Sequence, residues 1–168
     1  MIEEKIAIIL GGRDDEELVN NSGMLGILER LDVPYEYSII SSDQNPEVLL
    51  EYCVESWESG IRIFICIAGL VPALPGAVKG LLPLSTVISV PLTSKEYDAR
   101  DIILASLSVP SKRPVIILGV NTSGLKKAAY CAAEILGLTN ENLQKRVQKF
   151  LEEETAKPLL RSKLYGKK

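Results

Sequence analysis

The chain has 168 residues, a formal net charge of −3 at pH 7 and only 5% aromatic residues. A chain of this length is typical of a single domain that buries roughly 70% of the surface exposed by its unfolded form. An acidic balance without a basic stripe argues against a nucleic-acid-binding protein. No run of about 18 apolar residues occurs, and the first residues do not read as an export signal, so we expect a cytoplasmic protein with no membrane segment.

The three cysteines favour a reducing compartment. Cys53, Cys66 and Cys131 are odd in number, widely spaced and set in apolar runs. This pattern is typical of reduced, buried thiols rather than of a disulfide framework or a metal site. We therefore expect neither a structural metal nor a cofactor.

The first half of the chain alternates apolar runs with helical patterns. Residues 5–10 predict a strand buried on both faces, which ends at Gly11 and Gly12. Asp14 or Asp15 can cap one helix running to about residue 31. Further strands are predicted over 35–40 and 61–68, with a helix from Pro46 between them.

The second half continues the alternation. After a loop over 69–76, the pattern predicts a short helix, a strand over 87–90, a helix over about 98–108 and a strand over 115–118. A helix over about 124–136 follows. Residues from 140 onward predict a last amphipathic helix whose shared apolar face holds Leu143, Val147, Phe150 and Leu151.

Five strand-to-helix alternations predict an α/β fold: a three-layer α/β/α sandwich with a flavodoxin-like parallel sheet of about five strands and a C-terminal helix. We expect one domain over 1–138, with the helix and basic tail of 139–168 packed on it. Ligands of such sheets bind beyond the carboxyl ends of the strands. The loops over 11–15, 41–45, 69–76 and 93–98 should therefore converge on one rim and form the functional site.

Two helical segments are apolar nearly all round. Residues 102–109 and 128–136 carry few polar side chains, so each should be buried on more than one side. A small domain has little interior to cover both. This favours a homo-oligomer, with two central helices inside a monomer as the alternative.

The rim loops resemble those of the PurE family, the N5-carboxyaminoimidazole ribonucleotide mutases and phosphoribosylaminoimidazole carboxylases. The family's Gly-Ser-x-Ser-Asp loop corresponds to residues 11–15, and its Ser-Ala-His-Arg-Thr-Pro-Glu loop to residues 41–47. Its Gly-Gly-Ala-Ala-His-Leu-Pro-Gly loop resembles residues 69–76. The resemblance covers about residues 4–138 and implies an octamer of flavodoxin-like subunits, with active sites at subunit contacts.

The chain departs from the family at residues that the resemblance makes functional. It contains no histidine, and Asp43 stands where the family has the His taken as its proton-transfer group. Gln44 replaces the neighbouring Arg. The positions of the two loop-one serines hold Gly12 and Asp14, and that of the second His holds Ala73. Asp15 and Ser41 are unchanged.

These positions give the candidate site. Asp43 is the candidate acid/base, although an Asp whose pKa is ordinarily near 3.9 needs burial or a like-charged neighbour to act near neutral pH. Arg13 and Arg100 are the candidates to replace the missing anion-binding Arg. The resemblance implies a small-molecule substrate such as an aminoimidazole ribonucleotide. Its remaining candidate contacts are Gly11, Gly12, Asp15, Ser41, Gln44, Gly69, Leu74 and Pro75.

Three hypotheses remain open at this level. The first is an active relative that handles a carboxyl group on a small heterocycle with altered specificity. The second is a non-catalytic paralogue that binds a ligand or regulates a partner. The third treats Asp14, Asp15 and Asp43 as a site for a hard cation such as Mg²⁺, although Asp14 and Asp15 are also explained as acids at a helix start.

Overall fold

The computed structural model describes residues 5–69 and 73–156. Within these ranges a five-stranded parallel sheet forms the centre, in the order β2-β1-β3-β4-β5. Its strands are β1 (Ile6–Leu10), β2 (Tyr35–Ile39), β3 (Ile63–Gly69), β4 (Thr86–Leu92) and β5 (Ile116–Ile117). The predicted flavodoxin-like α/β architecture is confirmed.

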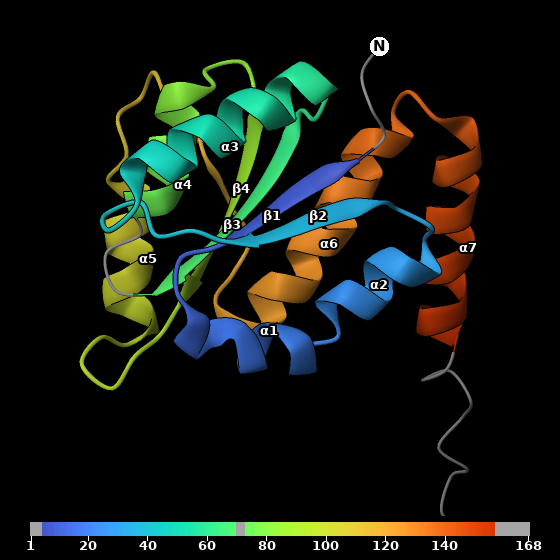
Figure 1. Cartoon of the computed structure of the whole chain (residues 1–168). Helices are drawn as coiled ribbons and strands as arrows, with labels where there is room; N and C mark the ends of the chain where they lie inside the picture. The colour runs from blue at the N-terminus through green and yellow to red at the C-terminus, as the bar shows by residue number, and fades with distance from the viewer. Residues whose placement is uncertain (1–4, 70–72, 157–168) are drawn as a thin grey trace, which may run out of the picture.

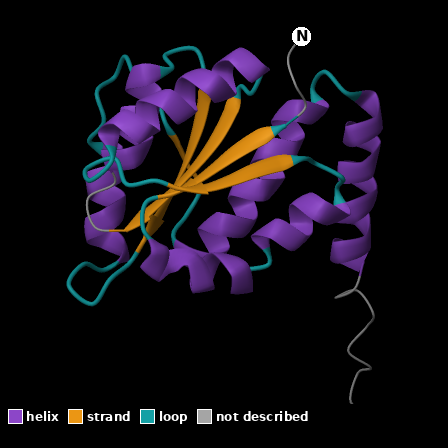
Figure 2. Ribbon diagram, in the orientation of Figure 1, coloured by secondary structure: helices purple, strands orange, loops and turns teal. Residues whose placement is uncertain are grey.

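Helices cover both faces of the sheet (Figures 1 and 2). Their bounds are η1 (a 3₁₀ turn, Arg13–Asp15), α1 (Glu16–Asn21), α2 (Met24–Arg30), α3 (Pro46–Ser59), α4 (Ala73–Leu81), α5 (Ala99–Leu107), α6 (Asn121–Gly137) and α7 (Glu141–Ala156). One apolar core joins the sheet to α1, α2, α6 and α7, and the other joins it to α3 and α4. Along β1, Ile6, Ile8 and Leu10 enter the first core, and Ala7 and Ile9 enter the second. This alternation explains why the whole strand is apolar.

The single helix predicted over 14–31 is wrong, because the chain turns in its middle. α1 ends at Asn21, and Gly23 adopts a left-handed φ of 83° before α2 begins. The hydroxyl of Ser22 donates to the carbonyl of Val19 at 2.6 Å and accepts from the amide of Met24 at 3.1 Å. Apolar residues keep a helical spacing on both sides of the turn at Ser22 and Gly23. The periodicity of the sequence therefore does not reveal the turn. The predicted Asp cap is also not seen: Asp15 precedes α1 without a side-chain capping bond.

The two nearly all-apolar helices differ in burial. In α6 the four alanines at 128, 129, 132 and 133 are 0% exposed within one chain, because α2, α7 and the sheet cover them. The prediction that both helices lack cover in a monomer is therefore wrong for α6. On α5, in contrast, Leu104 and Leu107 are 56% and 63% exposed. Within the described residues, no helix combines the length and apolarity that crossing a membrane requires.

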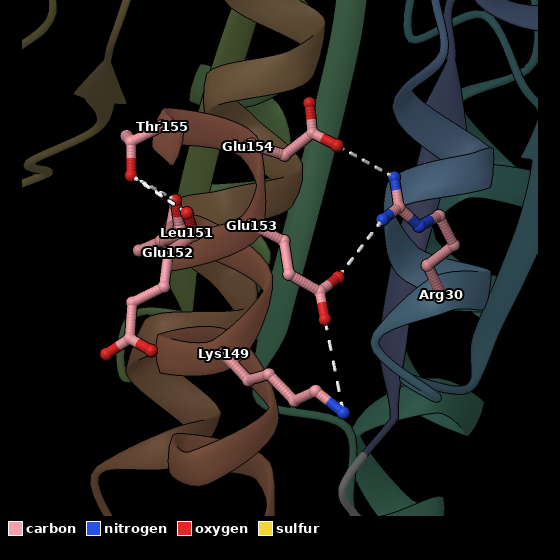
Figure 3. Close-up of polar contacts among 7 residues, drawn as sticks. All are labelled: Arg30, Lys149, Leu151, Glu152, Glu153, Glu154 and Thr155. Carbon is pink, nitrogen blue, oxygen red and sulfur yellow. Dashed lines mark hydrogen bonds and ion pairs between the residues drawn. The ribbon is translucent and has the colours of Figure 1, made fainter. Parts of the chain in front are cut away.

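Arg30 at the end of α2 contacts α7 (Figure 3). The guanidinium of Arg30 lies 4.1 Å from the centroid of the Phe150 ring, and its nitrogens lie 3.2 Å from Glu154 Oε1 and 3.9 Å from Glu153 Oε2. Leu143, Val147 and Phe150 are buried as predicted, whereas Leu151 is 37% exposed and lies at the margin of that face.

Candidate functional site

The carboxyl ends of β1, β2, β3 and β4 and the described residues that follow them meet around a cleft of about 670 Å³. Residues 70–72 of the predicted loop over 69–76 lie outside the described residues. Parallel strands bring such loops to a common edge, as the sequence predicted. The first loop contributes Gly11, Gly12, Asp14 and Asp15. The others contribute Ser41, Ser42, Asp43 and Gln44; Ala68, Gly69 and Leu74; and Thr93, Ser94 and Glu96.

The first loop lies directly against the end of β3. The amide of Gly11 donates to the carbonyl of Ile67 at 2.8 Å, and a Cβ added at Gly11 would lie 3.3 Å from that of Ala68. A side chain at position 11 would therefore press the two strand ends apart. A Cβ at Gly12 would meet nothing within 4 Å, so this residue leaves open space in the cleft wall.

The second loop is a turn built on Ser41. Its hydroxyl accepts from the amide of Gln44 at 3.2 Å, and its carbonyl accepts from the amide of Asn45 at 3.0 Å. The turn presents Asp43 to the cleft, where the Ser42 hydroxyl lies 3.4 Å from Asp43 Oδ1. Asp43 is exposed, so its carboxylate is accessible to a ligand.

The fourth loop is joined to the start of α6. The amide of Thr93 donates to Asn121 Oδ1 at 2.9 Å, and Asn121 Nδ2 donates to Thr93 Oγ1 at 2.8 Å. Ser94 Oγ accepts from the amides of Glu96 and Tyr97, which closes the loop as a turn. These bonds place Thr93, Ser94 and Glu96 in the lining.

The structure brings most of the predicted site residues together. The cleft is lined by Asp43, Gly11, Gly12, Asp15, Ser41, Gln44, Gly69 and Leu74, but not by Arg13, Pro75 or Arg100. Arg13 is exposed in the 3₁₀ turn, and Pro75 is buried in α4. Arg100 is exposed in the first turn of α5, where its amide donates to Asp98 Oδ1 at 2.7 Å.

Six lining residues were not among the predicted ones: Asp14, Ser42, Ala68, Thr93, Ser94 and Glu96. Thr93, Ser94 and Glu96 belong to the loop over 93–98, which the sequence predicted to lie on the rim. This was the sequence feature that could have identified them. Small hydroxyl residues in a loop give no periodic or compositional signal of their own.

Asp15 is the carboxyl in this cleft whose pKa its surroundings raise. Burial is the main cause and the neighbouring charge of Asp14 the second. A Cβ added at Gly69 would lie 3.9 Å from Asp15 Oδ2, so this carboxyl lies beside the end of β3. Burial and a like charge both favour the protonated form.

The cation-site and cysteine hypotheses are also tested by the geometry. Within the described parts of the chain, no group of three or more His, Cys, Asp or Glu side chains is placed to hold a metal ion. Asp14, Asp15 and Asp43 therefore do not form the cation site considered from the sequence. Cys66 is fully buried, and burial and nearby Cys53 raise its thiol pKa well above the ordinary value. This agrees with a core role.

This topology and rim cleft define a flavodoxin-like α/β protein with a cleft at the carboxyl edge of its sheet. The AIR carboxylase family model matches residues 5–157, so the chain belongs to this family. It is a PurE-like member, within a family of purine biosynthesis.

Curated relatives include two N5-carboxyaminoimidazole ribonucleotide mutases. That of Saccharolobus solfataricus is 33% identical over 149 residues, covering 89% of this chain and 91% of the relative. That of Bacillus subtilis is 33% identical over 144 residues, covering 84% and 86%. The crystal structure of Treponema denticola PurE superposes with a TM-score of 0.83 at 25% identity, covering 96% of this chain and 99% of that one.

Proposed function

We propose that the cleft carries out carboxyl-group chemistry on a small heterocycle, with a specificity altered from that of the mutases it resembles. The observation that supports this proposal most directly is the position of Asp43. It follows β2 in the second rim loop, at the place where the family resemblance puts the proton-transfer His, and its exposed carboxylate lines the cleft.

The reaction of the named relatives moves a carboxyl group from an amine nitrogen to a ring carbon. The N–C bond breaks and carbon dioxide leaves, while the nitrogen gains a proton. The ring carbon then forms a C–C bond to carbon dioxide and loses its own proton. The step therefore needs one group that gives a proton and takes one back. We assign this role to Asp43, whose exposed carboxylate must be covered by the bound substrate to act near neutral pH.

The other loops supply a wall and polar contacts. Gly69 and Leu74 form a small, largely apolar surface, suited to holding carbon dioxide away from water. Ser41, Asp15 and Gln44 offer hydroxyl, carboxyl and amide contacts to the substrate, and the backbone of Gly11 and Gly12 allows close approach. Three predicted contacts, Arg13, Pro75 and Arg100, do not line the cleft of this chain. They could contact a bound substrate only from outside this lining.

We also propose that the protein is a cytoplasmic homo-octamer. Two helices support an assembly through exposed apolar side chains: Leu104 and Leu107 on α5, and Val48 and Leu50 on α3, which are 50% and 47% exposed. Light scattering after size-exclusion chromatography tests this state. A species of eight chains supports it, and a monomer contradicts it.

An ultraviolet assay with carboxyaminoimidazole ribonucleotide and with its dephosphorylated ribonucleoside tests the activity. Asp43→Asn should abolish turnover, whereas Glu58→Gln, which removes an equal charge from the exposed far end of α3, should leave it unchanged. Equal turnover in wild type and Asp43→Asn would contradict the role of Asp43. A wild type with no turnover on carboxylated aminoimidazoles would favour the non-catalytic, ligand-binding alternative.

A further inference from the structure

The charged residues that line the cleft are all acidic. Four acidic residues contribute to it, Asp14, Asp15, Asp43 and Glu96. Among the described residues that form the lining, none is Lys or Arg. Arg13 and Lys95 belong to the same loops, but the lining does not include them. A ligand entering the cleft therefore meets four carboxylates and no basic side chain in the lining that this chain supplies.

Two of the helices that begin at this edge, α3 and α5, carry acidic residues in their first turns. α3 carries Glu47 in its first turn. At α5, the Asp98 carboxylate already accepts from the amides of Arg100 and Asp101, in a capping box closed by Asp101. Helix amino termini bind phosphate through free N–H groups, and an acidic cap competes for those same donors.

The groups that remain suit a neutral or cationic ligand. Ser41, Ser42 and Thr93 place hydroxyls in the lining, which can bond to ribose or ring atoms. Asp43 and Glu96 are exposed carboxylates that can accept from an amine. A phosphate dianion would add negative charge beside carboxyls that already repel one another, since the charge of Asp14 already disfavours ionisation of Asp15.

We infer that the cleft binds an amino-substituted heterocycle without a phosphate group, at the level of the free base or nucleoside, with its amine toward Asp43 and Glu96. This inference rests on the proposed function and narrows its substrate class. It distinguishes the chain from the relatives whose names specify a ribonucleotide.

Calorimetric titration with one matched ligand pair tests the inference. The probes are 5-aminoimidazole ribonucleoside and its 5′-phosphate, titrated into the full-length protein at low and high salt. The nucleoside should bind at least about tenfold more tightly at low salt, a preference of about 1.4 kcal/mol. The difference between the affinities for the two probes should become smaller at about 1 M salt, where charges are screened beyond about 3 Å.

Two variants test whether the acidic side chains cause the preference for the nucleoside over its 5′-phosphate. Asp14→Asn and Glu96→Gln should each raise affinity for the phosphorylated probe by several-fold, while Glu58→Gln should not. Both positions are exposed, so the variants should fold, and circular dichroism checks this.

The outcomes separate this inference from the proposed function. Tighter binding of the phosphorylated probe would overturn the inference but leave the proposed carboxyl chemistry intact. An unchanged preference in both variants would overturn the electrostatic explanation on which it stands. Failure of both probes to bind at any salt concentration would count against the inference and the proposed function together.

Discussion

The side chain of Asn121 is hydrogen-bonded twice to Thr93, although 28 residues separate them. Its Oδ1 accepts from the Thr93 amide at 2.9 Å, and its Nδ2 donates to Thr93 Oγ1 at 2.8 Å. Asn121 has a left-handed φ of 51°, which asparagine tolerates better than most residues. One side chain thus joins the start of α6 to the cleft loop that follows β4.

Replacing Asn121 should destabilise the protein in a graded way. Asn121→Ala loses both bonds and puts alanine, which tolerates the left-handed region less well than asparagine, at a φ of 51°, so the free energy of unfolding should fall by about 2–4 kcal/mol. Asn121→Gly loses the same bonds without that steric cost and should lose less. Urea denaturation measures both. Equal losses would show that the backbone conformation contributes nothing.

Two glycines should respond oppositely to alanine. In α6, a Cβ at Gly124 would lie 2.5 Å from the carbonyl oxygen of Gly119, so Gly124→Ala must displace backbone and should cost at least about 1–3 kcal/mol. In α2, a Cβ at Gly26 would meet nothing within 4 Å. Gly26→Ala should therefore stabilise the protein by about 0.5–1 kcal/mol. Thermal unfolding of the pair checks both signs.

The contact of Arg30 with α7 should depend on ring stacking more than on its ion pairs. Arg30→Ala should cost about 1–2 kcal/mol, because the guanidinium lies over Phe150. Glu153→Gln should cost less than about 1 kcal/mol, since its pair with Arg30 spans 3.9 Å between half-exposed side chains. A larger loss for Glu153→Gln than for Arg30→Ala in denaturant titrations would contradict this order.

Asp15 should make stability fall as pH rises. Its folded-state pKa lies above the ordinary value of 3.8, so the native state holds this proton more tightly than the unfolded state. The stability that Asp15 contributes to the native state is fully present below pH 3.8, and it is lost as pH rises through the folded-state pKa. The unfolding free energy of Asp15→Asn relative to wild type should therefore increase with pH across that interval.

Asp14→Asn provides the control for this pH dependence. It removes the smaller cause of the shift and leaves the burial of Asp15 in place. Most of the fall in unfolding free energy with rising pH should therefore persist in Asp14→Asn. Chemical denaturation at several pH values measures it. A flat profile in that variant would show that charge, rather than burial, dominates.

The sequence predicted the sheet chiefly because β1 and β3 are apolar on both faces, and it predicted loops at Gly11 and Gly69, where these two strands end. It did not predict the turn at Gly23, since the apolar spacing of a helix continues across it. The eight site residues found in the cleft follow strand ends, where topology decides position. Arg13 and Arg100 were chosen by charge, and charge does not specify where a side chain lies. Asn121 was missed because its partner is 28 residues away.

The most direct test is a crystal structure of the protein with an aminoimidazole ligand. We predict that the heterocycle occupies the cleft beside Gly69 and Leu74, with its amine within hydrogen-bonding distance of the Asp43 carboxylate. A ligand bound elsewhere, with the rim loops unoccupied and Asp43 in contact with solvent alone, would contradict the proposed site.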